Sequence, residues 1–331
     1  MFYEGSGLKV TDSITNRQQF QGLGTEVVTI GLHIVDILGR PVEQIPAGQG
    51  LALLDEIRMT VAGTCAATAV DLARLGIRVS SFGVVGADSL GSWMVQTMQE
   101  EGVDTEGIVS VAGVYTSATM LPIRPNGERP ALHVIGANSL VTKELIDWQR
   151  VSGAKHLHVG GSLLLEKLDG LPTAEIFAKA KSQGMSTSLD IIGVPGRDYE
   201  AVFGAVYENL DYLLVNEDDA KLLSNETNLK KACAWFIERG VKSTVITVGA
   251  EGAIYQSATE EIRVPAYKVE VVDTTGCGDA FSAGFITGLI KGMSSTECLE
   301  LGVAYGSSVA TGLGSDAGVS SFPELLDFMS R

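Results

Sequence analysis

The chain has 331 residues, of which 45% are hydrophobic, 19% are charged and 39 are glycine, a composition that excludes a disordered or fibrous protein. The net charge of −16 argues against binding to nucleic acid or to anionic membranes. An anionic small substrate stays compatible with this charge, because a helix N-terminus and local cations act at short range.

Residues 1–24 lack the continuous apolar core of a signal peptide, and no later stretch reaches the roughly 18 apolar residues of a membrane span. We interpret residues 1–24 as a loose N-terminal extension and residues 25–331 as a single domain of a cytoplasmic protein. The four cysteines are far apart and form no CxxC pair, which favours a reducing compartment over a disulfide framework or a zinc site. They are Cys65, Cys233, Cys277 and Cys298.

From residue 25 onward, β-rich runs alternate with longer helical stretches. The runs are TEVVTIGLHIV (25–35), SSFGVVG (80–86), HLHVGG (156–161), STSLDII (186–192), LDYLLVN (210–216) and STVITVG (243–249). The first helices are predicted over 64–76 and 89–102, and each ends in glycine. This alternation predicts an α/β fold, a three-layer α/β/α domain with a mainly parallel central sheet. Ligands are expected outside the carboxyl ends of its strands.

One segment interrupts the alternation. Residues 115–136 read as two strands joined by an Asn-Gly turn, with no helix beside them. Together with the first strands, this hairpin is expected to form a small β-sheet lid from segments near 36–62 and 111–135. Arg124 and Arg129 flank the turn, where they either reach a substrate or protect an exposed sheet edge from aggregation.

Near the C-terminus, VVDTTGCGDAFSAGF (271–285) places a glycine-rich turn at the start of a helix. The unpaired amides and the helix dipole there favour an anion, and glycines at 276 and 278 let the main chain approach it closely. A carboxylate beside a phosphate would only repel it, so we interpret Asp279 as a base that accepts the proton of an attacking hydroxyl. The alternative is that Asp279 caps the helix and the glycines make a tight turn. No P-loop or dinucleotide-binding motif occurs.

The stretch DTTGCGDAF resembles the DTxGAGD signature of the ribokinase-like (PfkB) carbohydrate kinase family. GVVGADSLG (83–91), NEDD (216–219) and TVGAEG (247–252) resemble three further family motifs in the same order. The resemblance implies a kinase that transfers the γ-phosphoryl group of ATP to a primary hydroxyl of a small sugar or sugar derivative. Asp279 would be the catalytic base, and an anion hole would hold the transferring group. The hole would be formed by the backbone of Gly276, Cys277 and Gly278.

The resemblance also assigns residues to the nucleotide and its metal ions. Thr247, Gly249 and Gly252 would line the ATP site. Asn216 and Asp219 would arrange Mg²⁺ and its waters, with Asp219 standing where the family has Glu. Asp273 and the loop after Gly314 resemble the region where many family members hold a monovalent cation such as K⁺.

The acceptor side departs from the family pattern. Asp36 matches the family's sugar-hydroxyl ligand, and Gly63 is kept from its GGxxxN motif. The first glycine and the asparagine of that motif are Ala62 and Ala67 in this chain. Of the DxNxR stretch only Asp190 remains. These losses leave the identity of the substrate open while the reaction type is kept.

Two alternatives follow from these departures. A nucleoside kinase shares the anion-hole motif, and a non-catalytic sugar or nucleotide sensor could keep the fold, although a pure binder gains nothing from Asp279. The family habit of pairing through the lid favours a homodimer. His156 and His158 lie on one face of a predicted strand, either as polar residues near the end of that strand or as metal ligands.

Overall fold

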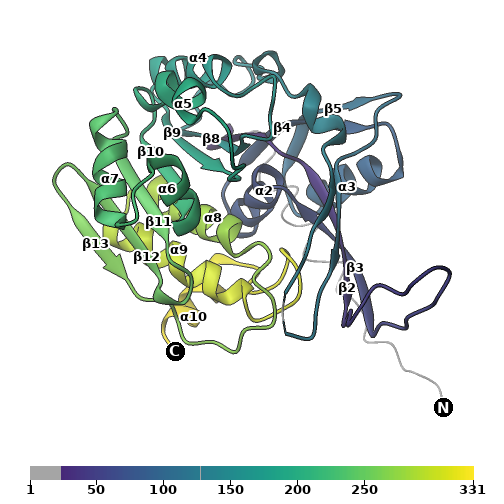
Figure 1. Ribbon diagram of the computed structural model, residues 1–331. Helices are drawn as coiled ribbons and strands as arrows, with labels where there is room; N and C mark the ends of the chain where they lie inside the picture. Colours follow the sequence, from purple (N-terminus) through teal and green to yellow (C-terminus); the bar gives the residue numbers. More distant parts are fainter. Residues whose placement is uncertain (1–23, 127) are drawn as a thin grey trace.

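The computed structural model describes residues 24–126 and 128–331, so the predicted extension over residues 1–24 lies almost wholly outside the described residues. The main body contains one nine-stranded sheet (Figure 1). In spatial order its strands are β13 (Glu261–Val264), β12 (Ala253–Ser257), β11 (Ser243–Thr247), β10 (Tyr212–Asn216), β9 (Ser186–Ile191), β8 (His156–Ser162), β1 (Val27–Gly31), β4 (Val79–Gly86) and β5 (Asp104–Val111). All pairings from β11 to β5 are parallel, and β12 and β13 are added antiparallel. The mainly parallel sheet is therefore confirmed.

Helices pack on both faces of this sheet and bury two separate hydrophobic clusters. One cluster involves α4 (Leu171–Ser182), α5 (Tyr199–Tyr207), α6 (Glu217–Ser224) and α7 (Leu229–Glu238). The other involves α2 (Thr64–Arg74), α3 (Ser89–Glu100), α8 (Cys277–Ile290), α9 (Ser295–Val309) and α10 (Phe322–Met329). Val28 and Val27, which are neighbours on β1, face opposite clusters, as strand alternation requires. The three-layer arrangement is confirmed.

The described residues also contain three short 3₁₀ helices, η1 (Gly136–Leu140), η2 (Lys143–Leu145) and η3 (Gly249–Glu251). Within residues 24–126 and 128–331, no helix has the length and apolar character needed to cross a lipid bilayer.

The first β-rich run was predicted as one element, but the structure divides it between two sheets. β1 ends at Gly31, and β2 (Ile34–Arg40) begins the smaller sheet. Gly31 has φ of 147°, and a Cβ added to it would lie 2.0 Å from the carbonyl oxygen of Gly160 on β8. Only glycine allows this approach, which turns the chain out of the main sheet.

The smaller sheet has the strand order β3-β2-β6-β7, with β3 (Glu56–Ala62), β6 (Ala118–Pro122) and β7 (Leu132–Val134). It stands off the main body, where β2 and β3 are labelled in Figure 1. The predicted hairpin is present as the antiparallel pair β6 and β7. Its first strand begins at Ala118, and residue 111, which was assigned to the lid from the sequence, is instead the last residue of β5 at the edge of the main sheet. We call this four-stranded sheet the lid.

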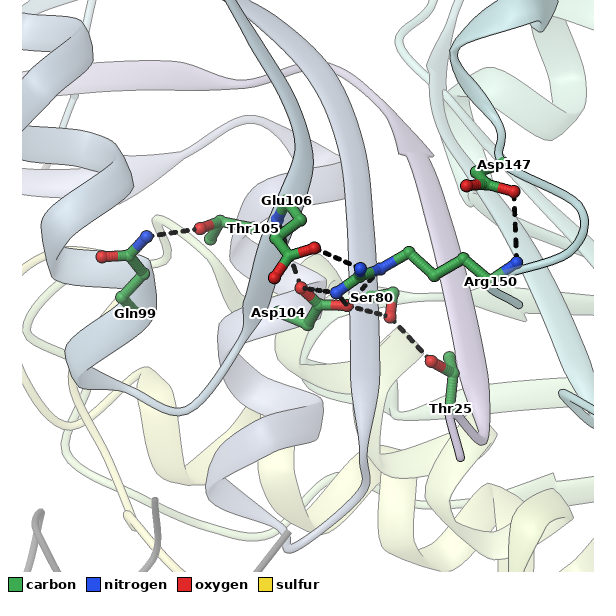
Figure 2. A network of polar contacts seen from close by, with 8 residues as sticks. All are labelled: Thr25, Ser80, Gln99, Asp104, Thr105, Glu106, Asp147 and Arg150. Atoms are coloured by element: carbon green, nitrogen blue, oxygen red, sulfur yellow. Dashed lines mark hydrogen bonds and ion pairs between the residues drawn. The ribbon is translucent and has the colours of Figure 1, made fainter. Parts of the chain in front are cut away.

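A polar network ties together the starts of three neighbouring strands at the end of the main sheet opposite to the expected ligand edge (Figure 2). Arg150, in the segment before β8, pairs with Asp104 at 2.8 Å and with Glu106. Ser80 donates to Asp104 at 2.6 Å and lies 2.7 Å from the hydroxyl of Thr25. Through Ser80 and Asp104 the contacts connect Thr25 with Arg150, so the network joins the starts of β1, β4 and β5 to the segment before β8. This is in keeping with our proposal that residues 25–331 fold as one domain.

Candidate active site

The glycine-rich loop before α8 leaves backbone amides free at the start of a long helix. Gly276 precedes the helix with φ of 79°, and a Cβ on it would lie 2.5 Å from Cα of Ser315, so this position requires glycine. The amide of Cys277 makes a long turn bond of 3.4 Å to Thr274. Within residues 24–126 and 128–331, the amides of Gly278 and Asp279 donate no hydrogen bond. They are available to an anion, and the helix dipole adds to their attraction.

Asp273 fixes the shape of this loop. Its Oδ1 accepts hydrogen bonds from the amide and the hydroxyl of Thr275 at 3.0 and 2.8 Å, and its Oδ2 accepts from the amide of Gly314 at 2.9 Å. The carboxylate is buried. These three bonds hold the loop against the segment after α9, which explains an Asp at this position without any metal ion.

Gly278 differs from Gly276, since a Cβ on Gly278 would meet no protein atom within 4 Å. The protein itself therefore does not require glycine there. The open space lies beside the free amides, where a bound group would need it.

Asp279 occupies the first turn of α8 with its side chain partly exposed. Within the described residues, no donor reaches its carboxylate. Burial, followed by the neighbouring carboxylate of Asp36, raises the pKa of Asp279 to about 7, and the guanidinium of Arg129 opposes this rise. A carboxylate with a pKa near neutrality, an open face and no partner is suited to accept a proton.

Asp36 lies on the face of the lid that turns toward Asp279. Strand pairing places it in a row with Thr60 on β3, Thr119 on β6 and His133 on β7. Burial raises the pKa of Asp36 to about 6, against the lowering effects of the Thr119 hydroxyl and of Arg129. The Thr119 hydroxyl also lies 3.1 Å from Nδ1 of His133. This polar row gives the lid several hydrogen-bonding groups for an acceptor.

Thr119 and His133 were not identified from the sequence. Their relation to Asp36 depends on the parallel pairing of β2 with β6, which joins segments about eighty residues apart along the chain. Once that register is known, alternation along the strands places all of these residues on one face.

Gly63 marks the junction of the lid with the main body, directly after β3 and before α2. Its φ is 84°, and a Cβ there would lie 2.6 Å from the carbonyl oxygen of Leu32. The backbone geometry alone explains this glycine. Ala67, at the position of the family's asparagine, is buried within α2.

On the nucleotide side, Asn216 at the end of β10 pairs with Thr247 at the end of β11. The two strands are parallel, so their carboxyl ends meet at one edge of the sheet. Gly249 has φ of 56°. Gly252 has φ of 99°, and a Cβ on it would lie 1.9 Å from the carbonyl oxygen of Val264. The turn between β11 and β12 thus favours glycine at both positions, and neither residue places a side chain at this edge.

Asn216 caps α6 and holds Asp219. Its Oδ1 accepts from the Asp219 amide at 2.8 Å, and its Nδ2 donates to Asp219 Oδ2 at 2.7 Å. Burial raises the pKa of Asp219. Glu217, by contrast, pairs with Lys221 on the outer side of the helix, as is typical of an acidic residue in the first turn of a helix.

Asp190, at the end of β9, links the two sides of the site. Burial, followed by the carboxylates of Asp279 and Asp219, raises its pKa well above the usual range. Its Oδ1 is buried without a hydrogen-bond partner in the described part of the chain. From the sequence, Asp190 was recognised only as the remaining residue of the family's DxNxR stretch, and no role was predicted for it. In the structure the Asp190 carboxyl lies near enough to Asp279 and Asp219 for their charges to act on it.

These carboxylates are compatible with a hydrated magnesium ion. Residues 24–126 and 128–331 contain no cluster of three or more His, Cys, Asp or Glu that would hold a metal directly. Mg²⁺ commonly keeps several waters and binds one or two carboxylates plus substrate phosphates. The unpartnered oxygen of Asp190 and the held carboxylate of Asp219 fit that mode.

The two hairpin arginines have different partners. Arg124 donates to the carbonyl oxygen of Glu43 at 2.5 Å, away from the loop before α8. Arg129 donates to the hydroxyl of Thr275, and its Nη1 lies 3.7 Å from Oδ1 of Asp273. Of the two roles predicted for this pair, only Arg129 is placed to reach a substrate.

His156 and His158 are buried and hydrogen-bonded to the next strand. The two ring nitrogens of His156 lie 2.7 Å from the hydroxyls of Ser186 and Ser188, and Nδ1 of His158 lies 2.8 Å from the Ser188 hydroxyl. Burial lowers the pKa of both rings to about 3. Of the two readings of this pair, the structure favours polar residues within the sheet.

Comparison with known proteins gives one consistent result. The model of the pfkB family carbohydrate kinases matches residues 24–321. The chain is 26% identical over 275 residues to the ribokinase of Haemophilus influenzae, covering 81% of this chain and 87% of that protein. It is 29% identical over 273 residues to the ATP-dependent ribose-1-phosphate kinase of Halopiger xanaduensis, covering 81% and 86%.

Among solved structures, an E. coli protein assigned as a ribokinase II, in complex with ATP and Mg²⁺, superposes with a TM-score of 0.79. That protein is 26% identical, and the match covers 93% of this chain and 99% of the other. The shared topology extends over the main sheet and the lid together.

Proposed function

The chain belongs to the pfkB family of carbohydrate kinases, and on that premise we propose that it transfers the γ-phosphoryl group of ATP to a primary hydroxyl of a small sugar or sugar derivative. It is thus a phosphotransferase with an alcohol group as acceptor. The observation that carries the proposal is the unpartnered carboxylate of Asp279, beside free amides at the start of α8.

In the proposed reaction, the acceptor lies between the lid and α8. Asp36 accepts hydrogen bonds from hydroxyls that do not react, and Asp279 accepts the proton of the hydroxyl that does. The new bond forms between that oxygen and the γ-phosphorus, while the bond to the bridging oxygen breaks and ADP leaves with its electron pair. The amides of the Gly276–Gly278 loop, together with the free amide of Asp279, stabilise the negative charge on the transferring group.

On the nucleotide side, Thr247, Gly249 and Gly252 are proposed to leave room for ATP against the backbone, next to Asn216. Asp219 and Asp190 would hold Mg²⁺ through its waters, in keeping with the ATP and Mg²⁺ bound by a relative of known structure. When bound, the ion neutralises phosphate charge. A monovalent cation near Asp273 stays a prediction, which potassium-dependent turnover would test.

The acceptor is left open between sugars and nucleosides, since the polar side chains of the family's acceptor motifs are absent at Ala67 and after Asp190. A panel of pentoses, hexoses, sugar acids, sugar phosphates and nucleosides, assayed by ADP release, decides between them. The native chain is expected to act on a sugar, and the Asp279→Asn variant is expected to lose about 10² to 10⁴ in kcat. Turnover of nucleosides alone would favour the second candidate, and binding without turnover would favour a sensor.

We further propose a homodimer formed through the lid. The lid face opposite Asp36 carries a row of apolar side chains, and several of them are exposed although they lie on a regular sheet. The row consists of Ile37, Met59, Met120 and Leu132, with Ile57 and Val134 beside it. A sheet with one uncovered apolar face is typical of an interface, and a second copy offers a matching face.

Light scattering coupled to gel filtration tests the dimer. Met120→Asp on the lid is expected to give a monomer, because it would bury a carboxylate in the interface. Val109→Asp, at an exposed position on β5 outside the lid, is the control. A native chain that elutes as a monomer at micromolar concentration would contradict the proposal.

We propose that the protein is cytoplasmic, because its cysteines form no disulfide. Cys65, Cys233, Cys277 and Cys298 are all free, which suits a reducing environment such as the cytosol.

A further inference from the structure

Arg129 connects the lid to the loop that precedes α8. It lies between β6 and β7, its Nη1 donates to the hydroxyl of Thr275, and the guanidinium lies 3.7 Å from Asp273. Asp273 already accepts bonds from Thr275 and from the Gly314 amide. The loop is therefore held without Arg129, and the contact calls for a different explanation.

The charges around this contact are strongly unbalanced. The site gathers the carboxylates of Asp36, Asp190, Asp219, Asp273 and Asp279. Across the described ranges, Arg129 is the one basic side chain whose charge lowers the pKa of both Asp36 and Asp279. A transferring phosphoryl group adds further negative charge here, and its transition state spreads that charge over three oxygens. Arg129 brings a positive charge from the lid to this group, in addition to the Mg²⁺ proposed on the nucleotide side.

The guanidinium also has donors to spare. It carries five N–H groups, and within residues 24–126 and 128–331 only one of them makes a hydrogen bond, to Thr275. Its planar fork matches two oxygens of a phosphoryl group. About a third of the side chain is exposed, so it can change partners without unpacking the core.

We propose that Arg129 is a further catalytic residue, which binds the transferring phosphoryl group and stabilises its charge while the lid covers the acceptor. This proposal rests on the kinase function proposed above. Arg129 neither gives nor takes a proton: the acceptor proton passes to Asp279, and the electron pair of the broken bond leaves with ADP. Thr275 holds the guanidinium in place before ATP binds. Phosphoryl transfer is thereby coupled to the position of the lid.

A different role for Arg129 would be to bind an anionic group of the acceptor itself. The contact with Thr275 favours the first role, because it places the guanidinium at the loop whose amides are proposed to hold the transferring group. The two roles also differ in kinetics. Loss of a phosphoryl ligand lowers kcat for every acceptor, whereas loss of an acceptor ligand raises KM for anionic acceptors only.

The test compares Arg129→Gln and Arg129→Lys with Arg124→Gln, a matched change in the same hairpin that leaves the loop before α8 untouched. Calorimetry first measures the binding of magnesium ADP with and without aluminium fluoride, a mimic of the transferring group that requires no knowledge of the acceptor. For Arg129→Gln we expect unchanged ADP affinity and loss of the tightening that aluminium fluoride gives the native chain. With the acceptor found in the panel, kcat is expected to fall about 10²- to 10³-fold at nearly constant acceptor KM.

Arg129→Lys keeps the charge but not the fork, so intermediate values are expected, and Arg124→Gln should match the native chain. If Arg129→Gln lowers the unfolding temperature, Arg129→Lys is compared with the native chain in its place. Native values in both assays for Arg129→Gln would overturn the proposal, as would a raised acceptor KM with kcat preserved. A native chain that phosphorylates nothing in the panel would refute the kinase function, while the aluminium fluoride measurement would still decide the role of Arg129.

Discussion

Asp279 should give the reaction an acidic limb close to neutral pH. Only the ionised carboxylate can accept the proton of the acceptor hydroxyl, and burial, followed by the charge of Asp36, raises the pKa of Asp279 to about 7. kcat/KM therefore rises with pH. From pH 8 to pH 5 the ionised fraction of Asp279 falls about a hundredfold, and kcat/KM should fall with it.

Direct quantification of ADP over this pH range, with a neutral acceptor, avoids coupling enzymes that have pH limits of their own. The Asp36→Asn variant provides the internal check. Removing the carboxylate of Asp36 lowers the pKa of Asp279, so the limb should move to lower pH even though the acceptor binds less tightly. Removing the opposing charge of Arg129 should move the limb to higher pH.

A kcat/KM that stays level from pH 5 to pH 8 would refute the reasoning, because a base with a pKa near 7 cannot give that profile. An acidic limb that persists unchanged in Asp279→Asn would equally refute it.

Other changes follow from the structure. Gly276→Ala should cost about 1–3 kcal/mol in the free energy of unfolding, since it forces φ of 79° on alanine and places a Cβ 2.5 Å from Cα of Ser315; urea unfolding measures the loss. Gly278→Ala should leave that free energy unchanged and lower kcat, because its methyl group meets only the space beside the bound phosphoryl group; a destabilised Gly278→Ala would contradict this. Asp71 is buried against the hydroxyl of Tyr305, and burial raises its pKa to about 8. Its ionisation opposes folding, so from pH 5 to pH 7 it should lower the unfolding free energy by about 1.4 kcal/mol per pH unit, and Asp71→Asn should remove that slope.

The parts of the site that are continuous in sequence were predictable. In the loop at 273–279 the functional groups follow one another in the sequence. Gly276 has the positive φ, and the free amides and the carboxylate belong to the residues directly after it. The alternation of strands and helices likewise predicted the layers. Both depend on local geometry, which a short stretch of sequence determines.

The remaining features depend on packing between distant segments. The row that joins Asp36 to Thr119 and His133 exists only through the pairing of β2 with β6. The convergence of Asp190 with Asp219 and Asp279 comes from the ends of separate elements. The partner of Arg129 depends on how the lid lies over α8. No periodicity or motif spacing encodes these contacts, so the sequence left them open.

The division of the first β-rich run has a similar cause. In the sequence, Gly31 is a single glycine within a predicted strand. That it turns the chain out of the main sheet becomes evident only from the close approach of Gly160 on β8.

The central claim is that one carboxylate and a set of helix-start amides act on the two ends of the same transferring group. The most direct measurement is a crystal structure of the native chain with a non-hydrolysable ATP analogue and the acceptor identified in the panel. The account predicts the reacting hydroxyl within hydrogen-bond reach of the Asp279 carboxylate and the γ-phosphoryl oxygens at the amides of Gly278 and Asp279. A nucleotide bound with its γ-phosphate turned away from those amides, or an acceptor held out of reach of Asp279, would contradict it.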